Sequence, residues 1–337
     1  MATRLLVGNR SARPIACLML VLGSLVRPAP APADDRQSRA DAWWTGPLLA
    51  ASAATLPQGH WLFEPYLFNV ITTGSLDAEG RHHPANPEHD FGSQSYIIYG
   101  LTDRLAIAVL PRFVFNEPAG APDSSHVGFG DLTIQAQYGL TRYREGSYVP
   151  AMSVVLAQTF PTGRFDHLER ASDAFGSGVY STALALYTQD YFWMPNGRIL
   201  RARLDLTYEV SQSAGVEDAS VYGTAQGFRG RAYPGDAATF DLAGEYSVTR
   251  SWVLALDLIY QHANSTRVSG VQPQSAGSDL LVPFEAATGA SESFGYAPAV
   301  EYSWSSTAGV IAGVRIIRAG RNVNTSITPA VAINLVF

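Results

Sequence analysis

Apolar and polar residues alternate along much of this chain, in blocks separated by clusters of Gly, Pro, Asn, Asp and Ser. In the block 199–211, every second residue from Leu200 to Val210 is apolar, and the residues between them include two arginines and two acids. A period of two residues places successive side chains on opposite faces of a β-strand. The block therefore predicts a strand with one apolar and one charged face.

The block 252–262 has the same period, and its apolar face begins at Trp252 and ends at Tyr260 with leucines between them. Its other face carries Asp257. Blocks 240–249 and 129–140 repeat this arrangement. Aromatic residues at both ends of an apolar face are typical of the interfacial girdles of membrane barrels. The opposite faces are too charged for a dry core, because buried charges without partners are costly.

Twelve such blocks are present, and the segments between them alternate between short turns and long loops. This alternation is typical of bacterial outer-membrane barrels. The predicted fold is therefore all-β, a transmembrane antiparallel up-and-down β-barrel over residues 61–337 with both termini on the periplasmic side. The strands are expected at 61–72, 94–101, 104–115, 128–141, 149–160, 177–191, 198–211, 237–248, 251–263, 293–304, 307–318 and 325–337. The long loops are expected near 73–93, 116–127, 161–176, 212–236, 264–292 and 319–324.

No segment after residue 33 approaches the roughly 20 apolar residues of a membrane helix. In hydrocarbon every backbone N–H and C=O needs a partner, so membrane-spanning strands must close into a barrel. Twelve strands enclose a lumen wider than that of eight-stranded barrels and narrower than that of sixteen-stranded porins. Small solutes fit such a lumen if nothing fills it.

Residues 1–33 are typical of a cleaved secretion signal, with arginines before an apolar stretch at 15–26 and a small-residue site at Ala31–Ala33. The single cysteine, Cys17, lies in this signal, so we expect no disulfide or thiol chemistry in the mature chain. Removing the signal's four arginines from 23 basic residues leaves 19 against 29 acidic ones, a net charge near −10. This acidic balance argues against a nucleic-acid partner.

The chain ends on an alternating apolar face that includes Ile333, Leu335 and the terminal residue Phe337. A final aromatic residue preceded by alternating apolar residues resembles the C-terminal signature of outer-membrane barrels. We interpret these three residues as the membrane-insertion signature, with the barrel-assembly machinery and outer-membrane lipid as partners. The alternative is an edge strand of a soluble β-sandwich, which would not depend on detergent.

The charged residues on the inward faces are the candidate site residues. In the functional interpretation, these residues line a polar channel and determine which solutes pass. In the structural interpretation, they form cross-strand ion pairs that fill the interior. Both interpretations stay open for Glu64, Arg112, Asp131, Arg201, Arg203, Asp205, Glu209, Asp241, Glu245, Asp257, Glu301 and Arg315.

Residues 34–60 precede the first strand and do not alternate. They include Trp43, Trp44 and a run of small apolar residues at 50–54. This segment is either a partial plug that enters the barrel from the periplasmic side or an extended lead-in with its tryptophans at the membrane interface.

The sequence contains no clear motif for a metal site or a catalytic site. His82, His83 and His89 with Asp90 are candidates for a metal site in the first external loop, but their spacing matches no strong ligand template, so we expect solvated loop residues and no metal or other cofactor. A barrel hydrolase needs a histidine that activates a serine. His262 lies three residues from Ser265, a spacing that directs the two side chains to different sides of a strand end. We therefore predict no enzyme activity and no catalytic residues.

Several short motifs are similar to those of the outer-membrane family named for the MetA pathway of phenol degradation. They are Trp44–Leu49, Leu56–His60, Glu64–Tyr66, Gly128–Asp131 and Pro161–Gly163. The resemblance covers most of the mature chain, and it implies an outer-membrane, transporter-like protein associated in some members with the breakdown of aromatic compounds. It brings no catalytic residues.

The sequence thus predicts an outer-membrane channel for passive uptake of small solutes, aromatic or hydrophobic ones among them. Two alternatives stay open: a structural or adhesive barrel whose loops 212–236 and 264–292 bind a ligand outside the cell, and a barrel hydrolase. The pattern does not identify the solute.

Overall fold

The computed structural model describes residues 36–275 and 277–337, and most of these residues lie in β-strands. The predicted signal at 1–33, with Cys17, lies outside the described residues. Two short 3-10 helices, η4 (Arg39–Asp41) and η5 (Ala171–Asp173), flank the sheets. None of the described helices has the length and apolar character needed to cross a membrane.

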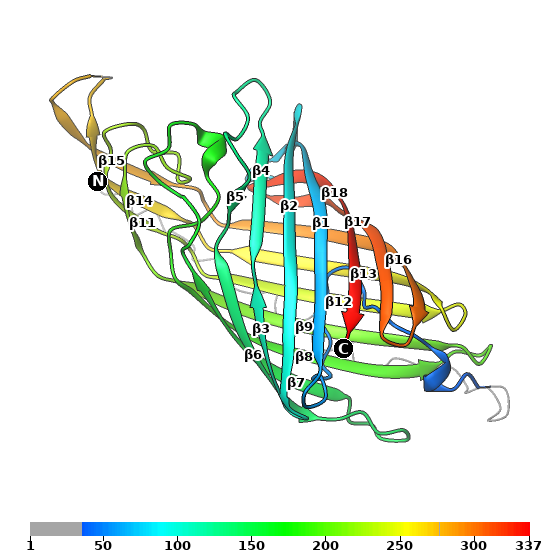
Figure 1. Cartoon of the computed structure of the whole chain (residues 1–337). Helices are drawn as coiled ribbons and strands as arrows, with labels where there is room; N and C mark the ends of the chain where they lie inside the picture. Colours follow the sequence, from blue (N-terminus) through cyan, green and yellow to red (C-terminus); the bar gives the residue numbers. More distant parts are fainter. Residues whose placement is uncertain (1–35, 276) are drawn as a thin grey trace, which may run out of the picture.

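Within the described residues, one antiparallel sheet closes on itself as a twelve-strand barrel, in which each strand pairs with the next along the chain. Closure is made by β1 and β18, which lie side by side in Figure 1 and pair from Leu62 with Val336 to Leu76 with Val323. The predicted up-and-down barrel is confirmed. Its strands are β1 (Trp61–Leu76), β2 (His82–Thr102), β3 (Leu105–Leu110) continued by β4 (Arg112–Glu117), β5 (Gly128–Phe129) continued by β6 (Leu132–Thr141), β7 (Ala151–Phe160), β8 (Ser181–Trp193), β9 (Ile199–Ser211), β12 (Ala237–Ser247), β13 (Trp252–Ala263), β16 (Ser291–Ser305), β17 (Ala308–Arg321) and β18 (Val323–Val336).

Two of the twelve strands described here are interrupted. Pro111 separates β3 from β4, because proline has no N–H to donate to the neighbouring strand. Its carbonyl still accepts from Ser95, and the register with β2 is unchanged on both sides. Between β5 and β6, the pairing shifts by one residue at Gly130 and Asp131, which is a β-bulge. The bulge changes the direction of the Asp131 side chain, which holds a loop as described below.

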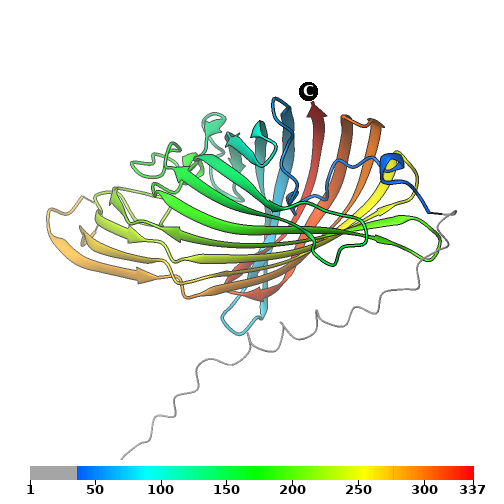
Figure 2. The same cartoon turned by 90° about the horizontal axis from the view of Figure 1, so that it is seen from below.

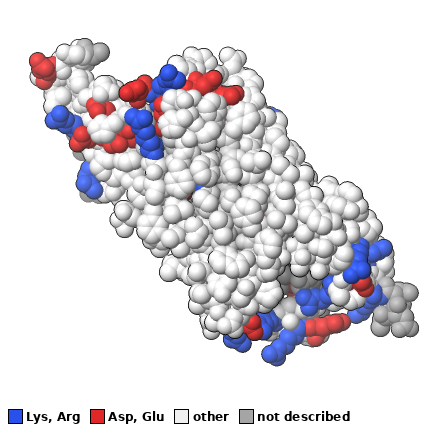
Figure 3. Space-filling view, in the orientation of Figure 1, with Lys and Arg blue, Asp and Glu red and all other residues white. Residues whose placement is uncertain are grey.

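The faces of the strands follow the predicted alternation. On β13, Leu254, Leu256 and Leu258 are about half exposed, whereas Ala255 and Asp257 between them are buried. At the two ends of this outer face, aromatic rings contact rings on β16: Trp252 with Tyr302, and Tyr260 with Phe294. Eight residues of strand rise separate the two pairs, about 26 Å. Figure 3 shows charged side chains at both ends of the molecule and almost none on the face between them. The outer surface therefore carries an apolar belt bordered by aromatic rings, as the lipid-facing surface of outer-membrane barrels does.

Four of the predicted loops contain β-strands. The predicted loops at 73–93 and 319–324 are mostly strand: β1 and β2 continue to a turn at 77–81, and β17 and β18 are joined through Asn322. The predicted loops at 212–236 and 264–292 contain β10 (Ala214–Glu217), β11 (Arg229–Tyr233), β14 (Arg267–Pro273) and β15 (Leu281–Ala287). The alternation is lost there because strands outside hydrocarbon need no apolar outer face, although their backbones still pair.

Strands β10, β11, β14 and β15 form a second sheet that extends beyond the barrel in Figure 1. Val216, Phe228, Ala232 and Val268 are buried in a small core of its own. The side chain of Phe165, from the segment between β7 and β8, packs against this core. The segments between β7 and β8 and between β9 and β12 are therefore joined into one packed cap over this end of the barrel.

Candidate functional site

A cluster of buried charged side chains joins β9 and β12 inside the described barrel. Arg201 and Glu245 are register partners, and Arg201 Nε donates to Glu245 Oε2 over 2.6 Å. A second bond from Arg201 Nη2 reaches Glu245 Oε1, and Arg203 Nε donates to Glu245 Oε2 over 3.0 Å. Glu245 is completely buried, and both arginines are nearly so. Two guanidinium groups thus share one carboxylate inside the barrel, which is a favourable geometry for a buried charge.

The N-terminal segment 36–60 runs through the inside of the barrel before β1 begins. In Figure 2 it starts beside the turn between β12 and β13 and crosses to the start of β1. Beside the turn between β12 and β13, the N–H of Trp43 donates to the carbonyl of Arg250. Near the start of β1, the Thr55 hydroxyl donates to the carbonyl of Asp103. Between these two points, the segment contacts inward residues of β6, β8, β9, β13, β16, β17 and β18.

Three inward carboxylates accept backbone N–H groups from this segment. Glu301 Oε2 accepts from Thr45 and Gly46 over 2.7 and 3.1 Å. Asp257 accepts from residues 48, 49 and 50 over 3.0 to 3.3 Å. Asp205 Oδ2 accepts from residue 51 over 2.6 Å. Every N–H from residue 45 to residue 51 is therefore bound to a carboxylate, since Pro47 has none to offer. We refer to Asp205, Asp257 and Glu301 as the acidic collar.

Further contacts hold the same segment. Arg203 Nη1 donates to the carbonyl of Ala50 over 2.9 Å, and the guanidinium of Arg201 lies 4.4 Å from the ring centre of Trp44. Gln137 Nε2 donates to the carbonyl of Ser52 over 2.8 Å. Leu48 packs into a buried cluster with alanines of β13, β16 and β18 and with Ile311. The segment is thus bound by charge, hydrogen bonds and apolar contact together.

Asp241 is a buried aspartate that the segment does not reach. It is the register partner of Asp205 and is 4% exposed. Its Oδ1 atom has no hydrogen-bond partner among the described residues, and the same holds for Oδ1 of Asp205. Carboxylates placed directly opposite each other on one face of a sheet are destabilising. This part of the interior therefore holds carboxyl oxygens that its arginines do not reach.

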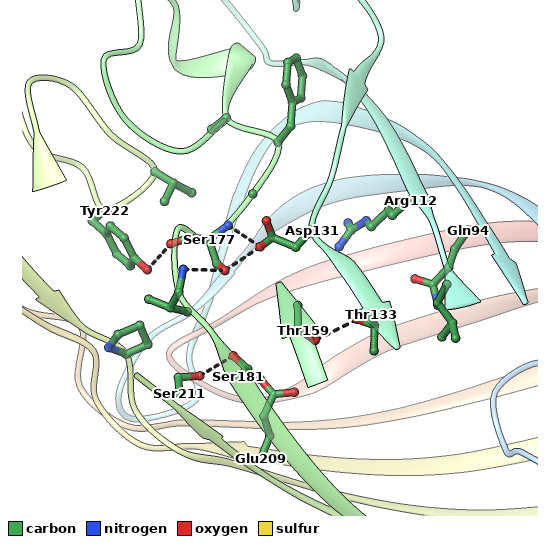
Figure 4. A pocket seen from close by; sticks show the side chains of 17 residues that line it. Gln94, Arg112, Asp131, Thr133, Thr159, Ser177, Ser181, Glu209, Ser211 and Tyr222 are labelled. Carbon is green, nitrogen blue, oxygen red and sulfur yellow. Dashed lines mark hydrogen bonds between the residues drawn. The ribbon is translucent and has the colours of Figure 1, made fainter. Parts of the chain in front are cut away.

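On the loop side of the barrel, the lumen contains a cavity of about 550 Å³. Figure 4 shows Gln94, Arg112 and Thr133 from the barrel wall on one side, and Ser177 and Tyr222 from the loops on the other. A second cavity of about 240 Å³ shares wall residues with the first and also reaches Tyr187 and Thr207. Tyr187 is the register partner of Asp205 in the acidic collar. The two cavities together thus extend from the loops to the level of the N-terminal segment.

The loop between β7 and β8 is held over the larger cavity by Asp131. Asp131 Oδ1 accepts from the N–H of Gly163 over 3.0 Å, and Oδ2 accepts from the N–H and the hydroxyl of Ser177 over 2.7 and 2.6 Å. Thr162 adds a hydroxyl bond to the carbonyl of Gly130 over 2.8 Å. A Cβ on Gly176 would lie 2.4 Å from Asp131 Oδ1, so no larger residue fits there. The short motifs 128–131 and 161–163 are thus two halves of one contact.

Tyr222, from the segment between β9 and β12, closes the opposite side of this loop. Its hydroxyl donates to the carbonyl of Ser177 over 2.5 Å. Burial raises the pKa of Tyr222 to about 12, so the phenol keeps its proton and stays a donor at ordinary pH. The roof of the cavity is therefore made by two loops that fix each other.

The predicted inward charges fall into three groups in the structure. Seven are buried in the part of the barrel that holds the N-terminal segment: Arg201, Arg203, Asp205, Asp241, Glu245, Asp257 and Glu301. Arg112, Asp131 and Glu209 line the large cavity, where Asp131 is saturated by loop donors. Glu64 and Arg315 are half-buried; Glu64 accepts from the Tyr66 hydroxyl over 3.4 Å and Arg315 donates to Gln261 over 2.6 Å.

Several neutral residues of the lumen were not predicted as site residues from the sequence. Gln137 and Gln189 bind the N-terminal segment, and Gln94, Thr133 and Thr159 line the cavities. All of these residues stand at inward positions of alternating blocks, so a count of every polar inward residue would have found them. The loop residues Phe175, Ser177 and Tyr222 carry no such signal, because their place depends on how the loops fold.

The candidate chemical groups do not assemble into a reactive site. His83 Nε2 lies 2.9 Å from Asp77 Oδ2, whereas His89 faces Asn69, and both histidines belong to β2 rather than to a loop. No three His, Cys, Asp or Glu residues of the described chain are placed to hold a metal ion. The hydroxyl of Ser265 bonds to loop backbone, and His262 Nδ1 lies 3.9 Å from Glu292.

A closed antiparallel barrel with an apolar belt outside and charges inside is a β-barrel of the outer-membrane type. Residues 85–323 match the family described as "Putative MetA-pathway of phenol degradation". The match covers well over half of the chain, so the chain belongs to this family. No curated protein matches the sequence.

Solved structures share the fold. The COG4313 outer membrane channel from Pseudomonas putida F1 superposes with a TM-score of 0.63 at 15% identity, covering 86% of this chain and all of that one. The β domain of the Bordetella autotransporter BrkA gives 0.44 at 12% identity, covering 82% and 99%. The toluene transporter TbuX of Ralstonia pickettii gives 0.37 at 10% identity, covering 84% and 90%. Only the first of the three has a TM-score above 0.5, and at 15% identity it shows similarity of fold alone.

Proposed function

We propose that this protein is an outer-membrane channel for the passive uptake of small solutes, including aromatic and other poorly soluble ones. The observation that carries the proposal is the pair of cavities that share wall residues inside a barrel whose outer belt suits lipid. Membership of a family described by phenol degradation, and similarity in fold to a Pseudomonas putida outer membrane channel, are consistent with this function.

The chemistry of the cavity suits small amphipathic molecules. Its loop side is lined by Val221, Tyr222 and Pro234, and its wall side by threonines, Gln94 and Arg112. Its volume of about 550 Å³ lies in the range of small-molecule sites. An apolar surface opposite a polar one favours a ring that carries a hydroxyl or carboxyl group.

The test is flux through liposomes that contain the purified barrel. We expect uptake of radiolabelled benzoate and glucose above protein-free liposomes, and exclusion of the trisaccharide raffinose. Thr159 lines both cavities, so Thr159→Trp should block their junction and lower the benzoate flux about tenfold. Leu156→Trp, on the lipid side of the same strand β7, is the matched control and should leave the flux unchanged.

No flux of benzoate or glucose through any folded form of the barrel would overturn the proposal. Folding is checked independently by the resistance of the barrel to migration as an unfolded chain in unheated gels. Fractionation of cells should place the protein with outer-membrane lipid, and recovery in the inner membrane would contradict the localisation.

A further inference from the structure

We infer that residues 43–52 are a plug, that the acidic collar is its docking site, and that solutes pass only when the plug leaves the collar. The inference rests on the proposed channel function and adds its regulation. It assigns Asp205, Asp257 and Glu301 to the binding of a peptide backbone instead of to a solute.

The pattern of donors carries this inference. Six N–H groups in the stretch 45–51 donate to carboxylates on β9, β13 and β16. A lead-in that only delivers the chain to β1 needs no such pattern, because its N–H groups can bind water. Buried carboxylates, in contrast, need donors, and the arginines of this region supply too few of them. The plug backbone supplies the missing donors.

The local sequence of the plug fits this role. Gly46 has φ +119°, a left-handed conformation that other residues rarely adopt, and it directs two successive N–H groups at Glu301. The small residues Ala50 and Ala51 allow the backbone to approach Asp257 and Asp205 closely, and Ala50 and Ala53 are buried. Trp44 is held at one end by Arg201.

The plug lies at the inner end of the two cavities. The smaller cavity reaches Tyr187 and Thr207, which neighbour Asp205 on the inner wall, and Asp205 binds residue 51 of the plug. Below this level the interior holds the plug and the Arg201–Glu245–Arg203 cluster. A solute that enters from the loops therefore meets the plug before it reaches the short turns.

The contacts between the plug and the barrel wall can break without disturbing the barrel. The plug is held by hydrogen bonds and one small apolar cluster rather than by pairing into the barrel sheet, so its release leaves all strand pairs intact. Water that enters the lumen can hydrate both the carboxylates and the freed N–H groups. Release of the plug is therefore less costly than any change in the barrel wall.

The first experiment weakens the collar. Asp257→Ala removes the acceptor of three plug N–H groups, and we expect the open probability in planar bilayers to rise at least tenfold. Asp241→Ala is the matched comparison, because it removes a buried aspartate of the adjacent strand that binds no part of the plug. Its effect should be less than a fifth of that of Asp257→Ala, and equal effects of the two variants would contradict the inference.

The second experiment locks the plug. A Cβ on Gly309 of β17 would lie 2.4 Å from Cγ2 of Thr45, so Thr45→Cys with Gly309→Cys places two thiols within disulfide reach. The mature sequence has no other cysteine. We expect the oxidised form to abolish benzoate flux in liposomes and dithiothreitol to restore it, with each single variant insensitive to both reagents.

The outcomes separate this inference from the proposed function. Equal flux through the oxidised and the reduced forms of the double variant would overturn the plug and leave the channel intact. Absence of flux through wild type, through the reduced double variant and through Asp257→Ala would instead overturn the channel. Formation of the disulfide is verified by gel mobility, which keeps the test valid if one variant folds poorly.

Discussion

Arg201 and Glu245 face each other directly across β9 and β12, and the same arginine lies over the ring of Trp44. The pair therefore joins the barrel wall to the N-terminal segment. We expect Glu245→Ala to lower the free energy of unfolding by about 3–5 kcal/mol, because two buried guanidinium groups lose their carboxylate. Urea unfolding in lipid vesicles, followed by tryptophan fluorescence, measures this change. Glu285→Ala, an exposed acid of β15, is the control, and a loss below about 1 kcal/mol for Glu245→Ala would contradict the prediction.

Asp131 is expected to keep the loop between β7 and β8 in place. Asp131→Ala removes the acceptor of three bonds from Gly163 and Ser177, so the loop should open more often. Trypsin cleavage after Arg164 or Arg170 should become at least about tenfold faster in the folded barrel. Unchanged cleavage would show that the cap sheet alone holds this loop.

A glycine substitution tests the same contact without removing a charge. Gly176→Ala would place a Cβ 2.4 Å from Asp131 Oδ1, so the loop must move away. We expect the same rise in trypsin cleavage as for Asp131→Ala. Gly215→Ala, whose Cβ would meet no atom within 4 Å, should behave as wild type. If both alanine variants behave alike, the close approach at Gly176 is not required.

The contact between two external loops should depend on pH. His167 Nδ1 lies 2.7 Å from Asp218 Oδ2, and this bond raises the pKa of His167. The pKa of Asp218 is lowered, first by the N–H of Gly227 and then by His167. The contribution of the ion pair is therefore complete below the usual histidine pKa and disappears as the pH rises through the raised value. At acid pH it is lost only when the pH falls through the lowered pKa of Asp218.

Proton NMR of the His167 ring in nanodiscs measures this effect. Asp218→Asn should move the midpoint of the titration down, toward the usual histidine pKa. Glu217→Gln is the control, since its carboxylate lies 3.7 Å from the other ring nitrogen and its loss should shift the midpoint less. A midpoint that does not change in Asp218→Asn would contradict the assignment.

The apolar belt gives a test of membrane placement. Leu256 is 44% exposed and lies midway between Trp252 and Tyr260, so an arginine there would face the middle of the hydrocarbon. Leu256→Arg should cost about 2–4 kcal/mol of unfolding free energy in lipid vesicles. Leu280→Arg replaces a leucine that is 59% exposed in the external cap and should cost less than about 0.5 kcal/mol. Similar costs at the two sites would place the belt outside the membrane.

The sequence by itself determined the barrel. The alternation on blocks such as 199–211 and 252–262 predicts strand number, neighbours and the face of each side chain, because the period of two is a local property of extended backbone. The same alternation places Asp257 and Glu301 on the inner face. Strand ends were predicted less well at the hairpins near 77–81 and 322, where no lipid contact enforces an apolar face.

Only the tertiary structure decided what the inner charges bind. Asp257, Asp205 and Glu301 look alike in sequence to Asp241, yet the first three accept N–H groups of residues 45–51 and Asp241 accepts none. The partner segment lies more than 150 positions away from each of them in the chain and has no period that marks its contacts. Hydrogen bonds between such distant groups depend on barrel closure and on the course of the chain through the lumen, and neither is a local property of the sequence.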